Sequence, residues 1–183
     1  GENSHIYYSV LNNYANYLRE YKIDINKSLV CYRNCINYLN QSSQDDPLRN
    51  LVYMGYSLAL AEAGDVKKAL ETIQSILISD YGKRSRLGVY ENPSIETLTI
   101  DSKTLKILST KYTILWSFYN KTPDRRKLEA ASNTAELIVS LLEKLRINIS
   151  DEESRLLLGD NFRNSYLNAI RDFNLLYAES SEP

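Results

Sequence analysis

Apolar side chains recur at intervals of three and four residues along most of this chain, and strictly alternating apolar runs are scarce. This interval is typical of helices that bury one face, because an α-helix completes a turn in 3.6 residues. Gly and Pro lie mainly between the apolar stretches, where helices would end. We therefore predict an all-α fold with seven helices, at about residues 4–21, 27–40, 47–63, 66–79, 102–120, 124–147 and 151–178.

The most regular part of the pattern is the segment 55–77, which reads GYSLALAEAGDVKKALETIQSIL. Two helical patterns flank a turn that contains Gly64. Small residues stand at Ser57 and Ala69, where the two helices of an antiparallel hairpin would touch. A large side chain there would hold the helices apart, so we expect both residues to be buried.

The same spacing of small and apolar residues recurs twice more. Its members are Tyr14, Ala15, Leu18, Ser28, Tyr32 and Cys35 before this hairpin, and Leu108, Tyr112, Leu115, Tyr119, Ala131, Ala135 and Ile138 after it. Hairpins of about 34 residues with small residues at the helix crossing are typical of tetratricopeptide repeats. The alternative is a helical bundle in which small residues recur by accident.

We predict one domain over residues 2–183, built as a tetratricopeptide-like, right-handed α-solenoid of stacked antiparallel helical hairpins. Its parts are repeat 1 at about 8–41, repeat 2 at about 47–81, a connector at 82–101, repeat 3 at about 102–147 and a final unpaired helix at 151–178. The chain opens with Gly-Glu-Asn and no initiator Met, so we expect it to be a fragment of a longer protein.

Charge and hydropathy narrow the classes of partner. The formal net charge is -1 and the charges are mixed along the chain, which disfavours both nucleic acid and an anionic membrane surface as partners. No apolar run is long enough to cross a bilayer, and the N-terminal residues do not resemble a signal peptide. We expect no nucleic-acid partner, no membrane partner and a cytoplasmic location.

The sequence contains no pattern that points to catalysis. Phosphate-binding glycine loops, metal-ligand spacings and nucleophile elbows are absent from it. Cys31 and Cys35 lie four residues apart on a predicted helix, and we expect both to be small buried residues. We therefore expect no metal, no cofactor and no enzyme activity, and an all-helical enzyme is the last of the alternatives.

The predicted binding surface follows from the repeat register. Stacked repeats line a groove with the first helix of each hairpin, and such grooves hold an extended peptide or a partner helix. We predict that the groove is lined by Asn12, Asn13, Asn16 and Arg19 from repeat 1 and by Leu51, Met54, Leu58 and Glu62 from repeat 2. Asn side chains suit a peptide backbone, because each amide carries both a donor and an acceptor.

The final predicted helix carries an apolar set too wide for one neighbour. We predict a further interface there with Phe162, Tyr166 and Phe173, facing either a second copy of the chain or a downstream domain of the same protein. The chain has 15 Tyr residues. We expect most of them to lie in the core or at its edge, including Tyr14, Tyr17, Tyr32, Tyr56, Tyr112, Tyr119 and Tyr166.

The second half of the chain resembles a known family more specifically. The motifs are Asn92-Pro93-Ser94, Leu115-Trp116-Ser117-Phe118-Tyr119, Leu128-Glu129-Ala130-Ala131, Lys144-Leu145-Arg146, Glu152-Glu153-Ser154-Arg155-Leu156, Tyr166, Ala169-Ile170 and Leu176-Tyr177. They resemble the tetratricopeptide region of bacterial CHAT-domain proteins, in which this region precedes a caspase-like peptidase domain. That family's catalytic His and Cys have no counterpart in the matched part of this chain.

The resemblance implies a non-catalytic scaffold that binds a protein or peptide, as the regulatory segment of a larger CHAT-type protein. A tetratricopeptide regulator that senses a ligand, with the repeats enclosing a small peptide or metabolite, is the alternative.

Overall fold

The computed structural model describes residues 2–41, 46–81 and 87–181, without the side chains of 2, 3, 80, 81, 152–159, 161, 180 and 181. Its helices are α1 (Glu2–Glu20), α2 (Ile25–Leu39), α3 (Leu48–Glu62), α4 (Val66–Tyr81), α5 (Ser102–Lys121), α6 (Arg125–Asn148) and α7 (Glu152–Ser181), with a 3-10 turn η1 (Ile95–Thr97). The described residues contain no strand, and the predicted all-α fold is confirmed. Residues 82–86 of the predicted connector lie outside the described part.

Helix ends agree with the predicted ones to within three residues. Four helices follow directly on an Asp whose carboxylate accepts a backbone N–H of the first turn. These are Asp24 from Lys27 at 2.9 Å, Asp65 from Lys68 at 3.2 Å, Asp101 from Thr104 at 2.7 Å and Asp124 from Lys127 at 3.1 Å. Gly64 follows α3 with a φ of +96°, a left-handed conformation that favours glycine. Local sequence therefore accounts for where most helices begin or end.

Asp101→Ala is expected to lower the free energy of unfolding by about 1 kcal/mol, because it leaves the Thr104 N–H without its capping oxygen. Asp101→Asn is the matched control, since an amide oxygen can accept the same hydrogen bond. Urea unfolding followed by circular dichroism measures both variants, and equal losses in the two would contradict the capping role.

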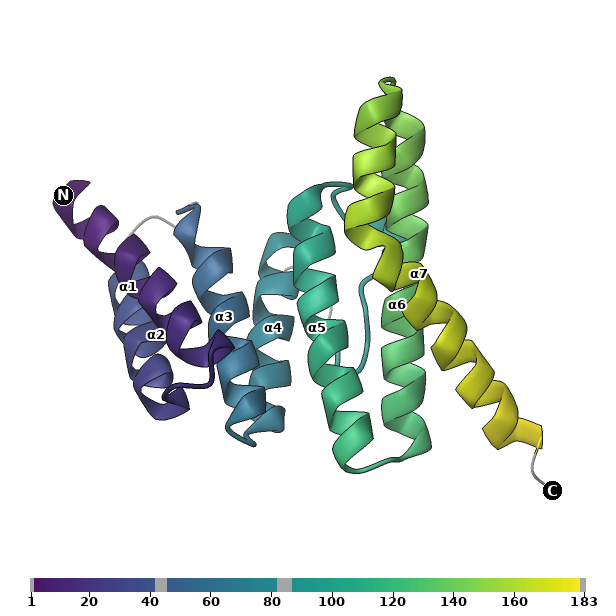
Figure 1. Ribbon diagram of the computed structural model, residues 1–183, viewed down its shortest axis with the longest axis horizontal. Coiled ribbons are helices and arrows are strands. Elements are labelled where there is room, and N and C mark those ends of the chain that lie inside the picture. The colour runs from purple at the N-terminus through teal and green to yellow at the C-terminus, as the bar shows by residue number, and fades with distance from the viewer. Residues whose placement is uncertain (1, 42–45, 82–86, 182–183) are drawn as a thin grey trace. The chain divides into compact units, whose positions relative to one another are not determined.

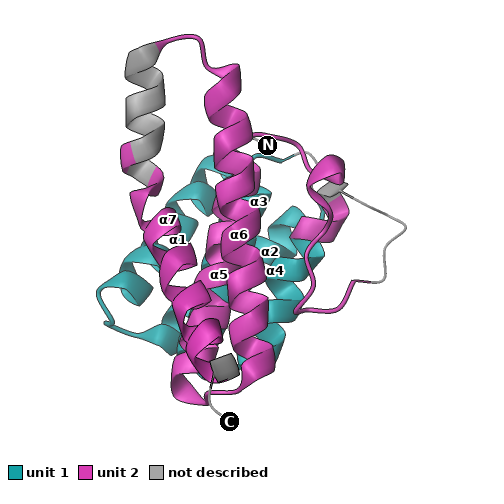
Figure 2. Cartoon of the chain, turned by 90° about the vertical axis from the view of Figure 1, so that its right-hand side faces the viewer, with its two compact units in different colours: residues 1–76 teal, residues 77–183 magenta. Residues whose placement is uncertain are grey.

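The chain divides into two compact units, Gly1–Ile76 and Leu77–Pro183, with the border inside α4 (Figure 2). The prediction of a single solenoid domain stays a prediction.

In unit 1 neighbouring helices pack side by side, α1 on α2 and α2 on α3, and α1 also contacts α3 (Figure 1). The predicted small residues lie in the core: Ala15, Ser28, Ser57 and Ala69 are all fully buried. The Ser28 hydroxyl donates to the Ala15 carbonyl at 2.8 Å, which ties α2 directly to the backbone of α1. Small side chains therefore allow the close helix approach that the pattern predicted.

In unit 2, α6 packs against α5 on one side and α7 on another, and η1 rests on α6. The predicted crossing residues Leu108, Leu115, Ala131 and Ala135 are all buried. The segment that precedes α5 is held by Lys111, whose ammonium donates to the Glu91 carbonyl and, at 2.9 Å, to the Asn92 Oδ1. Adjacent helices thus pack as expected for helical repeats.

The predicted burial of tyrosines is confirmed for some residues and wrong for others. Tyr32, Tyr56 and Tyr112 are buried, whereas Tyr14 and Tyr17 are exposed. Both exposed residues lie on α1, and the Lys27 ammonium of α2, 5.4 Å from the centroid of the Tyr14 ring, still leaves Tyr14 39% exposed. The apolar period marks this helix face correctly but does not reveal whether anything packs on it.

Candidate functional site

The predicted groove residues come from the faces of α1 and α3 in unit 1. Arg19 joins the two helices: its guanidinium lies 2.9 Å from the Glu62 carboxylate and 2.9 Å from that of Glu20. Met54, Leu58 and Glu62 follow each other at four-residue spacing on α3, so they share one face with this ion pair. We call the surface formed by Asn16, Arg19, Met54, Leu58 and Glu62 the groove face.

A buried tyrosine supports the groove face from below. The Tyr32 hydroxyl donates to the Asn16 Oδ1 at 2.6 Å, and the Tyr32 side chain is fully buried. It fits because Gly55 has no side chain: a Cβ at Gly55 would lie 2.5 Å from the Tyr32 oxygen. The position of Asn16 is therefore set by a contact among three helices, α1, α2 and α3.

The predicted groove residues differ in how far they can reach a partner. Asn12 is only 3% exposed and its Oδ1 has no hydrogen-bond partner among the described residues, so its side chain belongs to the interior. Asn13, Leu51 and Glu62 are exposed, and Asn16, Arg19, Met54 and Leu58 are half-buried. Asn12 is thus not available to a ligand in this structure, because α1 turns it towards the core.

Electrostatics suit the groove face to binding. Burial acts to lower the pKa of Arg19, but the hydrogen bonds and charge interactions with Glu62 and Tyr32 together outweigh it, so the pKa is raised. Burial raises the pKa of Tyr32 to about 12. At neutral pH the guanidinium therefore stays charged and the phenol stays neutral. The Arg19 guanidinium can position a ligand, whereas the buried Tyr32 acts only through Asn16, and neither group exchanges a proton easily.

Unit 2 contains an open hollow of about 710 Å³ between the segment Leu87–Glu96 and α6. Asn92, Asn133 and Ser140 contribute polar groups to its lining, and Glu91, Glu96 and Glu136 contribute carboxylates. Arg126 stacks on the Tyr90 ring at 4.9 Å from the ring centroid. The only sequence signal for this hollow is the length of the predicted connector.

Lys111 lies directly behind this hollow. The sequence pattern gave no indication that this lysine is buried. It is fully buried, and burial lowers its pKa to about 7, although the nearby Glu91 carboxylate acts to raise it. Asn92, which accepts from Lys111, also donates to the Thr134 hydroxyl of α6 at 3.0 Å. The wall of the hollow is therefore attached to both α5 and α6.

The three interface residues predicted on α7 have different surroundings. Phe162 is half-buried beside a small pocket of about 240 Å³, and the Tyr166 hydroxyl donates to the Glu143 carboxylate at 2.7 Å. Phe173 is 49% exposed. Leu167, Ile170 and Tyr177 are exposed along with it. Among the described side chains of α7, these exposed apolar ones thus lie in the C-terminal half of the helix.

A polar cluster fastens α7 to α5. The Asp172 carboxyl is fully buried and accepts from the Tyr112 hydroxyl at 3.3 Å, and burial raises the pKa of Asp172. The Arg171 guanidinium lies 3.4 Å from the centroid of the Trp116 ring and also donates to the Tyr112 oxygen. Such stacking is favourable for a cation over indole, so the cluster positions the helix.

No group of three His, Cys, Asp or Glu side chains suited to a metal ion occurs among the described residues. Cys31 and Cys35 are free and buried, as predicted, and burial raises the pKa of both thiols. Within the described part of the chain, no helix combines the length and the apolarity needed to cross a bilayer. Comparison with protein-family models, with curated proteins and with solved structures gave no match.

Proposed function

We propose that the chain is a non-catalytic scaffold that binds a protein or peptide through the groove face. The observation that carries this proposal is a mixed surface on α1 and α3, in which Asn16 and Arg19 are held by Tyr32 and Glu62 while Met54 and Leu58 remain partly exposed. Polar side chains that are already fixed, beside apolar ones, suit an extended peptide, because little further conformational entropy is lost when the peptide binds.

The wider role rests on the sequence resemblance. The chain acts as the tetratricopeptide segment of a larger, cytoplasmic, bacterial CHAT-type protein and regulates its downstream domain. The exposed apolar side chains of α7, among them Ile170 and Phe173, support a contact with that domain or with a second copy of the chain.

Peptides selected from a random display library against the full chain test the groove face. Leu58→Arg is expected to weaken the affinity of such peptides at least tenfold, because it places a long charged side chain among the half-buried contacts. Lys67→Glu is the matched control, a charge change on α4 at a side chain that is 87% exposed. Isothermal titration calorimetry measures both variants, and equal affinity of Leu58→Arg and the unmodified chain would refute the assignment.

The hollow in unit 2 supports a second candidate, a regulator that senses a small peptide. Three carboxylates, those of Glu91, Glu96 and Glu136, contribute to its lining and favour a ligand with a free amino group. A panel of dipeptides tests this function by thermal shift. A rise in the melting temperature that is lost in Glu136→Gln supports it, and a panel without any shift opposes it.

A further inference from the structure

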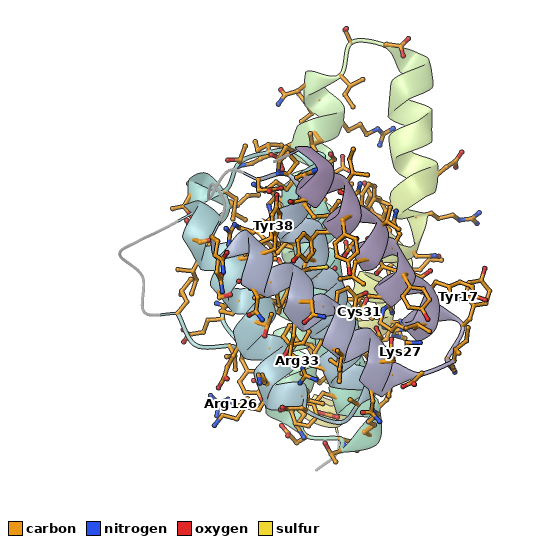
Figure 3. All side chains as sticks on the ribbon, turned by 90° about the vertical axis from the view of Figure 1, so that its left-hand side faces the viewer. Tyr17, Lys27, Cys31, Arg33, Tyr38 and Arg126 are labelled. Atoms are coloured by element: carbon orange, nitrogen blue, oxygen red, sulfur yellow. The ribbon has the colours of Figure 1, made fainter. Side chains whose placement is uncertain are left out.

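The outer side of α1 carries a continuous row of exposed apolar residues. Ile6, Val10, Tyr14 and Tyr17 are 62%, 61%, 39% and 49% exposed. Their spacing places them on one helix face, and Asn13 lies among them as an exposed residue. We call these five residues the α1 stripe. Figure 3 shows unit 1 with α1 and α2 towards the viewer and Tyr17 at their outer edge.

In the second predicted repeat, the residues equivalent to the α1 stripe are buried. The register that pairs Tyr14 with Tyr56 matches the α1 stripe to residues 42 positions later, namely Leu48, Val52, Gly55, Tyr56 and Ala59. The four of these with side chains are 5%, 0%, 6% and 0% exposed. The same face of the same repeat element is therefore buried in α3 and open in α1.

The helix that covers this face of α3 is α2 of the preceding hairpin. The two helices pack together, and the Tyr32 ring of α2 lies 6.3 Å from the Tyr56 ring and directly over Gly55. Terminal repeats of a solenoid usually carry a polar outer face, because an apolar one would remain in water. The α1 stripe has no charged residue and does not fit that role.

We infer that the α1 stripe is a docking surface for a further helical hairpin of the same repeat type, which covers α1 as α2 covers α3. This inference does not depend on the groove face. It concerns different residues, which form an apolar surface that is shielded from water only when another repeat packs on it.

The stripe also defines one property of the occupant. Gly55 accepts Tyr32 only because it lacks a Cβ, and the equivalent position in the α1 stripe is Asn13. A tyrosine at the position of Tyr32 in the docking helix would overlap the Asn13 side chain. The occupant therefore carries a small residue there, whereas the residues facing Val10 and Tyr14 are apolar.

The probe for this surface comes from the chain itself. A copy of residues 5–46 with Tyr32→Ala in the copy is joined ahead of His5, which preserves the repeat spacing of the full chain. A second version keeps Tyr32 in the copy and Asn13 in the original α1. A third version keeps Tyr32 in the copy and carries Asn13→Gly in the original α1. We expect the copy to dock in the first version, to dock more weakly in the second and to dock again in the third.

Docking is measured by tyrosine-selective chemical labelling and mass spectrometry. Tyr14 and Tyr17 of the original α1 are expected to react at least fivefold more slowly in the docked versions than in the chain alone. Tyr21 is the internal control, because it is 71% exposed and its repeat equivalent, Ala63, is also exposed. Equal labelling of Tyr14 and Tyr17 in all versions would overturn the inference.

Thermal unfolding gives a second readout. Val10→Asp is expected to leave the melting temperature of the chain alone nearly unchanged and to lower that of the docked version by several degrees. Val30→Asp is the control, since Val30 is also exposed and, in the register that pairs Ser28 with Ala69, matches Glu71, an exposed residue of the second repeat. If light scattering shows a dimer of the chain alone that Val10→Asp dissociates, the occupant is a second copy and the inference fails.

Discussion

Tyr32→Ala is expected to lower the free energy of unfolding by about 3–5 kcal/mol, the usual cost of removing a large aromatic ring from a packed core. Tyr32 is fully buried among α1, α2 and α3, and its hydroxyl is the partner of Asn16. Urea unfolding followed by circular dichroism measures the loss. Tyr21→Ala, at a side chain that is 71% exposed, is the control and should change stability by less than about 0.5 kcal/mol.

The contact with Gly55 makes this expectation sharper. Alanine is favoured over glycine within a helix by about 1 kcal/mol, yet a Cβ at Gly55 would lie 2.5 Å from the Tyr32 oxygen. Overpacking of this kind costs about 1–3 kcal/mol, so Gly55→Ala should destabilise the chain. In the Tyr32→Ala background the obstruction is gone and the same change should stabilise it. Additive effects of the two substitutions would contradict the proposed contact.

Lys111→Met is expected to remove a rise in stability with pH that the unmodified chain shows. The Lys111 pKa is about 7 in the folded chain, against an ordinary value of 10.5. Between these two values the unfolded chain holds a proton that the folded chain has released, so a rise in pH favours folding. From pH 6 to 8.5 this amounts to about 2 kcal/mol, since one pKa unit corresponds to about 1.4 kcal/mol.

Urea unfolding at several pH values in this window measures the slope. The window ends at pH 8.5 because of the Cys35 thiol. Burial raises its pKa from 9.0 to about 11, so at higher pH this group makes the stability fall as the pH rises. Lys106→Met is the matched control, an exposed lysine on the same helix whose removal should keep the slope. The interpretation of Lys111 is wrong if Lys111→Met and the unmodified chain show the same slope.

Among the candidate site residues, helical register accounts for which residues of α3 share a face. The spacing of Met54, Leu58 and Glu62 places them on one face of α3, and Glu62 of that face forms an ion pair with Arg19. Asn12 was assigned to the same surface, yet it is buried. A difference of less than one turn separates a groove position from a core position, and apolar periodicity does not resolve it for a polar residue.

By itself, the sequence determined the helices and their close contacts. Turn residues, capping carboxylates and the small residues Ser28, Ser57 and Ala69 act through neighbours at a known spacing, so their consequences can be derived locally. Only the tertiary structure decided which apolar faces are covered, how Tyr32 reaches Gly55 and why Lys111 is buried behind the hollow. Burial and the pKa changes that it causes depend on groups far apart in the chain, and a helical period carries no information about what those groups are.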